Sequence, residues 1–245
     1  EEKSKTFEKF LNGRTIKEAL TKLESQNHER SKYNTIPMRI NSNIDAEIAL
    51  KNKIKQLPED KLPIVIAGGS FNKKGKVTKI TPEGKIMLED LMKQISAEKV
   101  YFVIGHKMQG YEKAIVEISK KLNKKFEIDA IIPGMISKEE GNTLNAENIN
   151  AVRIAIDSDE MGIYKSFNYE IFERRKSIVL AFDGNSPVSN LVQEAKNGKG
   201  KSKVYVNRKN EVLSEKMNNL EGYVVPFSLE NDVVDRIIEE NPEIC

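Results

Sequence analysis

The chain has 245 residues, enough for one large domain or for one domain with an appendage. It carries 40 Lys and Arg against 37 Asp and Glu, a formal net charge of +3, and this near balance does not predict a nucleic-acid-binding surface. Its single cysteine, Cys245, excludes an internal disulfide and a cysteine-based metal site, and we expect a reducing, cytoplasmic setting.

The first residues carry no targeting signal. No stretch approaches the roughly 18 consecutive apolar residues of a membrane-spanning helix, and Glu1–Lys5 does not open a secretory signal peptide. We therefore expect no membrane partner. Because the chain does not start with Met, we also expect it to be an excised or processed piece of a longer protein, with an effector domain upstream.

Residues 1–60 are predicted to form a helical appendage or linker. Thr6–Gln26 places apolar residues near helical spacing, and Asp45–Leu57 is predicted to form a second helix. Between them, Glu29–Asn43 is polar and is typical of a linker or an extended arm. The pattern changes after the second helix, so we expect residues 61–245 to form the main domain.

In the main domain, short apolar runs alternate with longer amphipathic segments, which is the pattern of βαβ units. Apolar residues on both faces of the strands indicate a parallel sheet between two helix layers. We therefore predict an α/β fold, a doubly wound, mainly parallel Rossmann-like sheet with helices on both faces. The predicted strands are Pro63–Ala67, Val100–Ile104, Ile128–Ile132, Ser177–Phe182, Lys203–Val206 and Tyr223–Pro226, and the predicted helices are Pro82–Ala97, Tyr111–Leu122, Val188–Asn197 and Glu230–Glu239.

The residues that follow the strands are the predicted ligand-binding residues, because ligands of open parallel sheets bind outside the carboxyl ends of the strands. Glycines let the backbone approach a ligand, hydroxyl and amide side chains hydrogen-bond to it, and a helix that follows a strand presents its N-terminus to a phosphate. These residues are Gly68, Gly69, Ser70, Gly105, His106, Lys107, Gly110, Tyr111, Pro133, Gly134, Asp183, Gly184, Asn185, Ser186 and Ser189.

Each of these signals also has an ordinary explanation. Gly68-Gly69 is compatible with a tight turn, His106 with a solvated loop histidine, and Asp183–Pro187 with a turn and a helix N-cap. A ligand site is favoured because small and polar clusters follow four successive strands at one edge. The sequence has neither G-x-G-x-x-G after the first strand nor a P-loop motif, so NAD-linked and P-loop chemistry are not predicted, and we expect no cofactor and no metal.

At these residues the chain resembles the SLOG superfamily, which includes the DNA-processing protein A domain, the "Lonely guy" phosphoribohydrolases and nucleotide-sensing domains of bacterial defence proteins. Gly68-Gly69-Ser70 resembles the first-strand Gly-Ser turn of the family, and Gly105–Glu112 its second glycine-containing turn. Ile178–Ser186 resembles its apolar strand and phosphate-facing loop. The resemblance implies a Rossmann-like nucleotide-binding domain over about Pro63–Phe227.

The chain departs from the family pattern where the enzymes of the family act. The phosphoribohydrolases carry P-G-G-x-G-T-x-x-E, whereas Asp183–Glu194 lacks the later glycines. Related deoxyribosyltransferases place a nucleophilic Glu eleven residues after an Asp-Gly pair, a spacing that Glu194 has relative to Asp183, but the preceding Gly-Thr is missing. An isolated helical Glu is normally exposed, and we expect this of Glu194.

Three functions follow, and we favour the first. It is a sensor module in which glycine backbones and Ser or Asn side chains hold phosphate, while His106, Lys107 and Tyr111 contact the rest of the ligand, Tyr111 by stacking. The second is an N-glycosidase or deoxyribosyltransferase that uses Glu194, with Asp183 or Glu112 as proton shuttle. The third, single-strand nucleic-acid binding, is not favoured because the charge is balanced and Trp is absent. Modules of this kind are expected to form homodimers.

Overall fold

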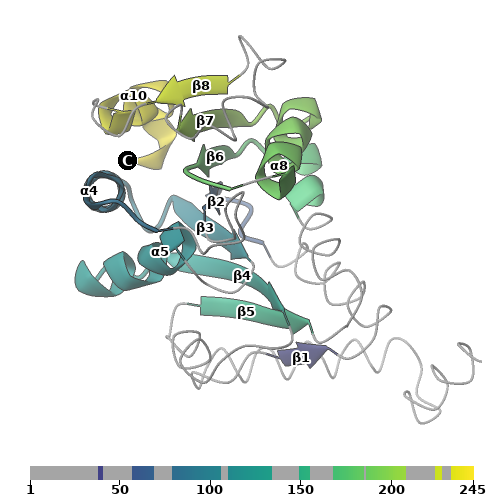
Figure 1. Cartoon of the computed structure of the whole chain (residues 1–245), viewed down its shortest axis with the longest axis horizontal. Helices are drawn as coiled ribbons and strands as arrows, with labels where there is room; N and C mark the ends of the chain where they lie inside the picture. Colours follow the sequence, from purple (N-terminus) through teal and green to yellow (C-terminus); the bar gives the residue numbers. More distant parts are fainter. Residues whose placement is uncertain are drawn as a thin grey trace, which may run out of the picture.

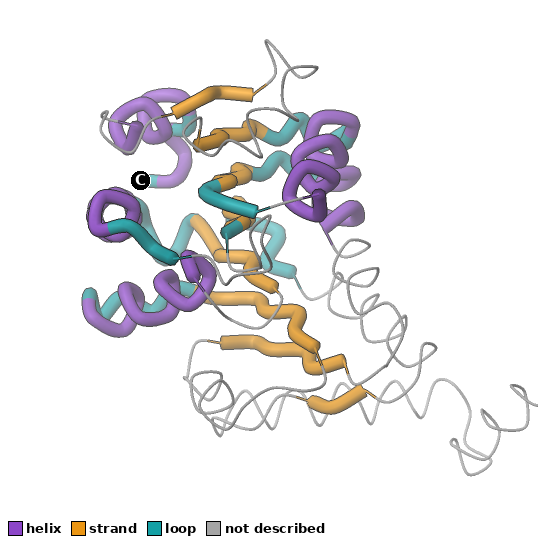
Figure 2. Tube along the Cα trace, viewed as in Figure 1, coloured by secondary structure: helices purple, strands orange, loops and turns teal. Residues whose placement is uncertain are grey.

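The chain folds around one parallel sheet. The computed structural model describes residues 38–40, 57–68, 79–105, 110–133, 149–154, 168–184, 186–207, 224–227 and 233–245. Within them eight strands pair in the order β1-β5-β4-β3-β2-β6-β7-β8, and every pair of neighbours is parallel. Figure 2 shows the strands as one layer. They are β1 (Met38–Ile40), β2 (Leu62–Ala67), β3 (Val100–Gly105), β4 (Glu127–Pro133), β5 (Ile149–Ile154), β6 (Ile178–Ala181), β7 (Lys203–Asn207) and β8 (Val224–Phe227).

Helices cover both faces of this sheet. On one face α4 packs against α5 and α10, and on the other α8 packs against β6 and β7 (Figure 1). Residues 168–174 form a further helix whose Phe172 is fully buried. The predicted doubly wound α/β fold is thus confirmed. The bounds are α4 (Pro82–Gln94), α5 (Gly110–Lys121), α8 (Ser186–Asn197), α10 (Val233–Glu240) and a 3₁₀ turn η3 (Pro242–Ile244).

The core lies between the sheet and the layer of α4, α5 and α10. All residues of β3 and β6 are buried, as expected for strands covered on both faces. Phe102 of β3 meets Phe126 edge to face, with ring centroids 5.3 Å apart. Each buried side chain of this size contributes roughly 1.5 to 3 kcal/mol to stability. Burial on both faces therefore stabilises the central strands that carry the candidate site.

Local sequence explains where α4 begins. Thr81 precedes the helix with extended backbone, and its Oγ1 accepts a hydrogen bond of 3.1 Å from the Gly84 N–H. Pro82 occupies the first helical position, where a missing N–H costs nothing, and Glu83 suits the positive end of the helix dipole. These signals were readable in the sequence, and the predicted start at Pro82 is confirmed.

The six predicted strands are all present, with ends that differ by at most one residue, and the four predicted helices of the main domain are present with ends that differ by up to three.

Two strands and one helix of the described residues were not predicted. β5 mixes apolar residues with Asn150 and Arg153, and the helix at 168–174 is short. β1 lies inside the segment predicted to be a linker, yet it pairs with β5 at the edge of the sheet. The predicted helices Thr6–Gln26 and Asp45–Leu57 lie almost wholly outside the described residues, and the boundary near residue 61 stays a prediction.

Candidate functional site

The strand order places a topological switch point between β2 and β6. From β2 the chain proceeds to β3, β4 and β5 on one side, and from β6 it proceeds to β7 and β8 on the other. The connections that leave the carboxyl ends of β2 and β6 therefore diverge. Ligands of open α/β sheets bind at such a point. The residues that follow β2 and β6 are accordingly the centre of the candidate site.

Gly68 follows β2 in a conformation that only glycine adopts readily. Its φ is +146°, and a Cβ there would lie 3.0 Å from Tyr111 Cδ2 and 3.1 Å from Phe182 Cβ. The Phe182 N–H donates to the Ala67 carbonyl over 2.9 Å. The end of β2 therefore lies directly against the residues that follow β6, and the structure brings the predicted residues Gly68 and Asp183 together.

Asp183 and Gly184 form the turn from β6 into α8. The Asp183 carboxylate accepts a hydrogen bond of 2.7 Å from the Gly184 N–H. Gly184 has φ +148°, and a Cβ there would lie 2.2 Å from Val188 Cγ2, so the turn packs closely on the first turn of α8. The first N–H groups of a helix have no partner within the helix and suit an anion. This turn therefore directs the N-terminus of α8 toward the switch point.

Asn207 is a site residue that the sequence analysis missed. It is the last residue of β7, it is 8% exposed, and its Nδ2 donates to the Phe182 carbonyl over 3.2 Å. The hydrogen bond ties the end of β7 to the turn that follows β6. The signal was present, because Asn207 directly follows the apolar run of the fifth predicted strand. The predicted strand stops at Val206, one residue before the end of β7.

Tyr111 does not have the stacking role that we expected. Its ring stacks on Phe182, with centroids 4.2 Å apart and planes at 12°, and only 2% of the residue is exposed. The Tyr111 backbone N–H donates to the Gly68 carbonyl over 3.2 Å. Phe182 occupies one face of the ring and Gly68 lies against its edge, so the ring is already used in packing and is not presented to a ligand base. Tyr111 is a packing residue that fixes the start of α5 on the end of β2.

Glu112 is the buried carboxyl of the candidate site. It lies in the first turn of α5 and is 3% exposed, and burial raises its pKa well above the usual 4.5. A hydrogen bond from the Gly105 backbone N–H opposes this rise but is the weaker effect. Gly105 is the last residue of β3. The carboxyl group therefore lies at the edge of the sheet that the predicted site occupies.

Several predicted ligand-binding residues have no described side chain. Pro133 is the last residue of β4, Ser186 is the first of α8, and only their backbone placement is described. Gly110 begins α5 with φ +57°, and Ser189 lies in the first turn of α8 with a half-buried side chain. The residues that lie outside the described part of the chain are Gly69, Ser70, His106, Lys107, Gly134 and Asn185.

Glu194 is distant from the switch point. It lies in the last turn of α8, and at about 1.5 Å per residue it is roughly 12 Å along the helix axis from Ser186. Its side chain is partly buried, which differs from the exposure that we expected of an isolated helical glutamate. Asp183, at the edge itself, is the nearer of the two residues that the catalytic hypothesis paired.

The described residues show neither a metal cluster nor a membrane-spanning helix. No group of three or more His, Cys, Asp or Glu in this part of the chain could hold a metal ion. None of the helices described there is long and apolar enough to cross a membrane.

Comparison with known proteins adds no identity. No family model and no curated protein matches the chain.

Proposed function

We propose that the chain is a nucleotide-binding sensor module whose ligand lies over the carboxyl ends of β2 and β6. The observation that supports this is the contact between two glycine turns at the switch point, where Gly68 lies against Phe182 and Asp183 and Gly184 leads into α8. Positive φ at both positions favours glycine, which has no side chain to cover the backbone there. A ligand can therefore approach two stretches of backbone and one helix N-terminus together.

The N-terminus of α8 is the proposed phosphate subsite. The free backbone N–H groups of its first turn, to which Pro187 contributes none, and its dipole favour an anion, and Ser189 lies in the same turn. No acidic side chain occupies the first turn of α8. A phosphate bound there meets hydrogen-bond donors and partial positive charge. A monophosphate, a diphosphate, a cyclic nucleotide or an ADP-ribose each offers such a group.

The resemblance to SLOG domains supplies the wider part of the proposal. It suggests a cytoplasmic module of a larger bacterial defence protein, in which ligand occupancy is transmitted to an effector through residues 1–60. The proposal also includes a symmetric homodimer of this module. The pairing of β1 with β5 supports the route, because it links the segment before the main domain to the sheet that carries the site.

The first experiment measures thermal stability in the presence of AMP, ADP, cyclic AMP or ADP-ribose, followed by chromatography of each mixture. A ligand at a hundred times its Kd stabilises the native state by about 2.7 kcal/mol, which is roughly 5 to 10 °C for a chain of this size. We expect one of the four to raise the Tm by this amount and to be recovered intact. No rise with any of them would contradict the proposal.

Substitution of Ser189 separates binding from folding. Ser189→Glu adds a carboxylate to the first turn of α8, where it stabilises the helix by roughly 0.3 to 1 kcal/mol and repels a phosphate. We expect the Tm without ligand to hold or rise while the ligand-induced rise is lost. Ser189→Gln, of the same size without the charge, should keep most of the response, as should Gln193→Glu one turn further along. Equal responses in all three variants would count against a phosphate at this helix.

The enzymatic alternative has one observation in its favour. A buried carboxyl with a raised pKa, as at Glu112, is the kind of group that protonates a leaving base in glycosidic cleavage. Against it, Glu194, the proposed nucleophile, lies at the far end of α8. Free base in the chromatogram would replace the sensor by an N-glycosidase.

A further inference from the structure

Strands β2 and β3 separate at the carboxyl edge of the sheet. Their pairing ends at Val65 and Val103. Beyond this point β2 continues beside β6 to Ala67, and β3 continues beside β4 to Gly105. The last two residues of each strand thus have one partner instead of two, and the edge of the sheet opens next to the switch point.

The first turn of α5 occupies this opening and is tied to both strands. On the β2 side the Tyr111 N–H donates to the Gly68 carbonyl over 3.2 Å. On the β3 side the Gly105 N–H hydrogen-bonds to the Glu112 carboxyl group. Helix α5 contacts both strands. The Glu112 carboxyl is therefore held at the end of β3, one strand away from Gly68.

One oxygen of this carboxyl group is not used by the protein. Within the described part of the chain, Glu112 Oε2 is buried and has no hydrogen-bond partner. Buried side-chain oxygens nearly always have one. Among the groups that shift the pKa of Glu112 there is no charged side chain of the described residues, only burial and the Gly105 N–H. Burial without a cation favours the neutral acid, which carries an O–H donor.

We propose that Glu112 is a ligand-contacting residue, whose neutral carboxyl group donates a hydrogen bond from Oε2 to an acceptor oxygen of the bound nucleotide. This inference rests on the proposed function, since it assumes a ligand at the same edge. The acceptor is an oxygen of the phosphate or of the sugar. Loss of the proton removes the donor and puts a negative charge beside an anionic ligand, so binding weakens as pH rises.

The test compares the binding of AMP and of adenosine to the wild type, Glu112→Gln and Glu112→Ala between pH 5 and pH 9. The Gln amide keeps an N–H donor at every pH, so we expect its affinity to change less with pH than that of the wild type. Ala keeps no donor, and we expect it to bind at least tenfold more weakly at pH 5. Comparing variants with the same ligand cancels the titration of AMP itself, whose second phosphate pKa is about 6.

The two ligands identify the acceptor. An effect of the substitutions on AMP alone assigns the bond to a phosphate oxygen, and an equal effect on adenosine assigns it to the sugar. If the wild type and both variants bind AMP equally at every pH, Glu112 does not contact the ligand while the proposed function stands. If neither AMP nor any other nucleotide of the panel binds the wild type, both proposals are overturned.

The protonation of Glu112 can be followed without ligand. The unfolded chain releases this proton near pH 4.5 and the native protein retains it to higher pH, so wild-type stability falls relative to Glu112→Gln as pH rises above about 4.5. We expect the Tm difference between these two proteins to grow with pH. A difference that stays constant from pH 4 to pH 9 would contradict a neutral buried carboxyl. This readout also shows whether each variant is folded.

Discussion

The Tyr111 ring is enclosed on two sides by residues of other elements. One face stacks on Phe182, and the hydroxyl end lies over Gly84 in α4, where a Cβ would be 2.3 Å from the phenol oxygen. The Thr81 N–H also points to this oxygen over 3.4 Å. The ring thus connects the cap of α4, the start of α5 and the end of β6. The buried ring therefore fixes the spacing of these three elements beside the candidate site.

Gly84→Ala is expected to destabilise the protein because the methyl group and the Tyr111 hydroxyl would occupy the same space. Overpacking of a well-packed core costs about 1 to 3 kcal/mol, or a Tm loss of several degrees in thermal unfolding. Ile86→Ala on the same helix should have little effect, since Ile86 is 61% exposed. Adding Tyr111→Phe removes the oxygen and should restore part of the stability. A double variant no more stable than Gly84→Ala would contradict this packing.

For single residues, the sequence predicted which ones lie at the candidate site better than it predicted what each one does there. Gly68 and the Asp183-Gly184 pair were identified because small residues after an apolar run indicate a strand end, and the structure places them in contact. Tyr111 was predicted to face the ligand. An aromatic residue at the start of a helix can face either a ligand or the core. The pattern of a single residue does not distinguish these two positions. Burial of Glu112 was not predicted either, because a glutamate in a first helical turn is usually solvated.

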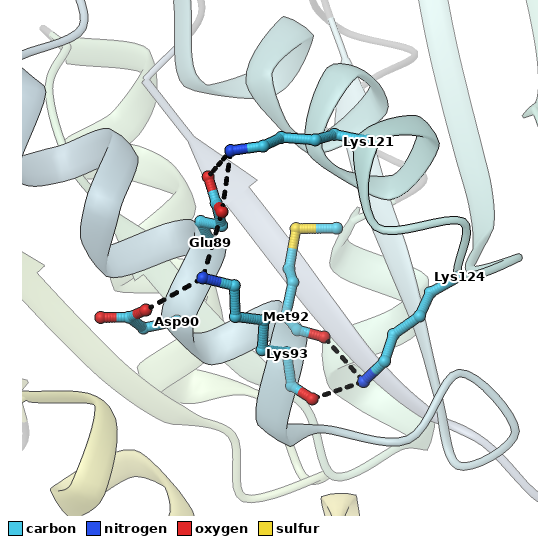
Figure 3. A network of polar contacts seen from close by, with 6 residues as sticks. All are labelled: Glu89, Asp90, Met92, Lys93, Lys121 and Lys124. Carbon is cyan, nitrogen blue, oxygen red and sulfur yellow. Dashed lines mark hydrogen bonds and ion pairs between the residues drawn. The ribbon is translucent and has the colours of Figure 1, made fainter.

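Helices α4 and α5 are joined by a network of lysines and carboxylates (Figure 3). Lys121 of α5 reaches both carboxylate oxygens of Glu89 in α4, at 2.9 and 2.7 Å, and Lys93 approaches the same group at 3.1 Å. Beyond α5, Lys124 donates to the carbonyls of Met92, Lys93 and Ile95, which end α4. A cation there satisfies carbonyls that the helix leaves open and complements the negative end of its dipole.

Replacing Lys124 by Met is expected to lower the free energy of unfolding by about 1 kcal/mol, because three carbonyls lose a charged donor. For a chain of this length that corresponds to roughly 2 to 4 °C in Tm. Lys125→Met is the matched control, since it removes the same charge from an exposed neighbouring residue. Thermal unfolding of the two variants should therefore differ. Equal losses would mean that net charge, and not the end of α4, determines the effect.

Among the elements, those with a clear hydrophobic pattern were predicted and those set by tertiary contact were not. β3 and α5 are strongly apolar on the faces that they bury, so their bounds followed from the sequence. β1 has three residues in a polar segment and is a strand because β5 lies beside it. β5 itself carries polar residues, and its assignment depends on pairing with β4. Pairing partners distant in sequence leave no local signal.

At the scale of the whole molecule the two edges of the sheet differ in chemistry. At the amino edge, lysines before or at the first residue of a strand are engaged by the protein. Lys61 pairs with Glu127 at 3.3 Å and Lys176 pairs with Glu243, while Lys99 and Lys203 donate to backbone carbonyls near the chain end. At the carboxyl edge, the described residues are glycine turns, the start of α8 and the buried Glu112. Ligand binding is expected at the second edge.

The measurement that tests this account most directly is amide chemical-shift mapping of the protein titrated with AMP, ADP, cyclic AMP or ADP-ribose. We predict that the largest shifts fall on Gly68, Gly105, Gly184 and the first turn of α8, and that the amides next to Lys61, Lys99 and Lys203 stay unchanged. Shifts concentrated at the amino edge would contradict a site at the switch point. The same would follow if none of the four nucleotides moved any amide at the carboxyl ends of β2 and β6.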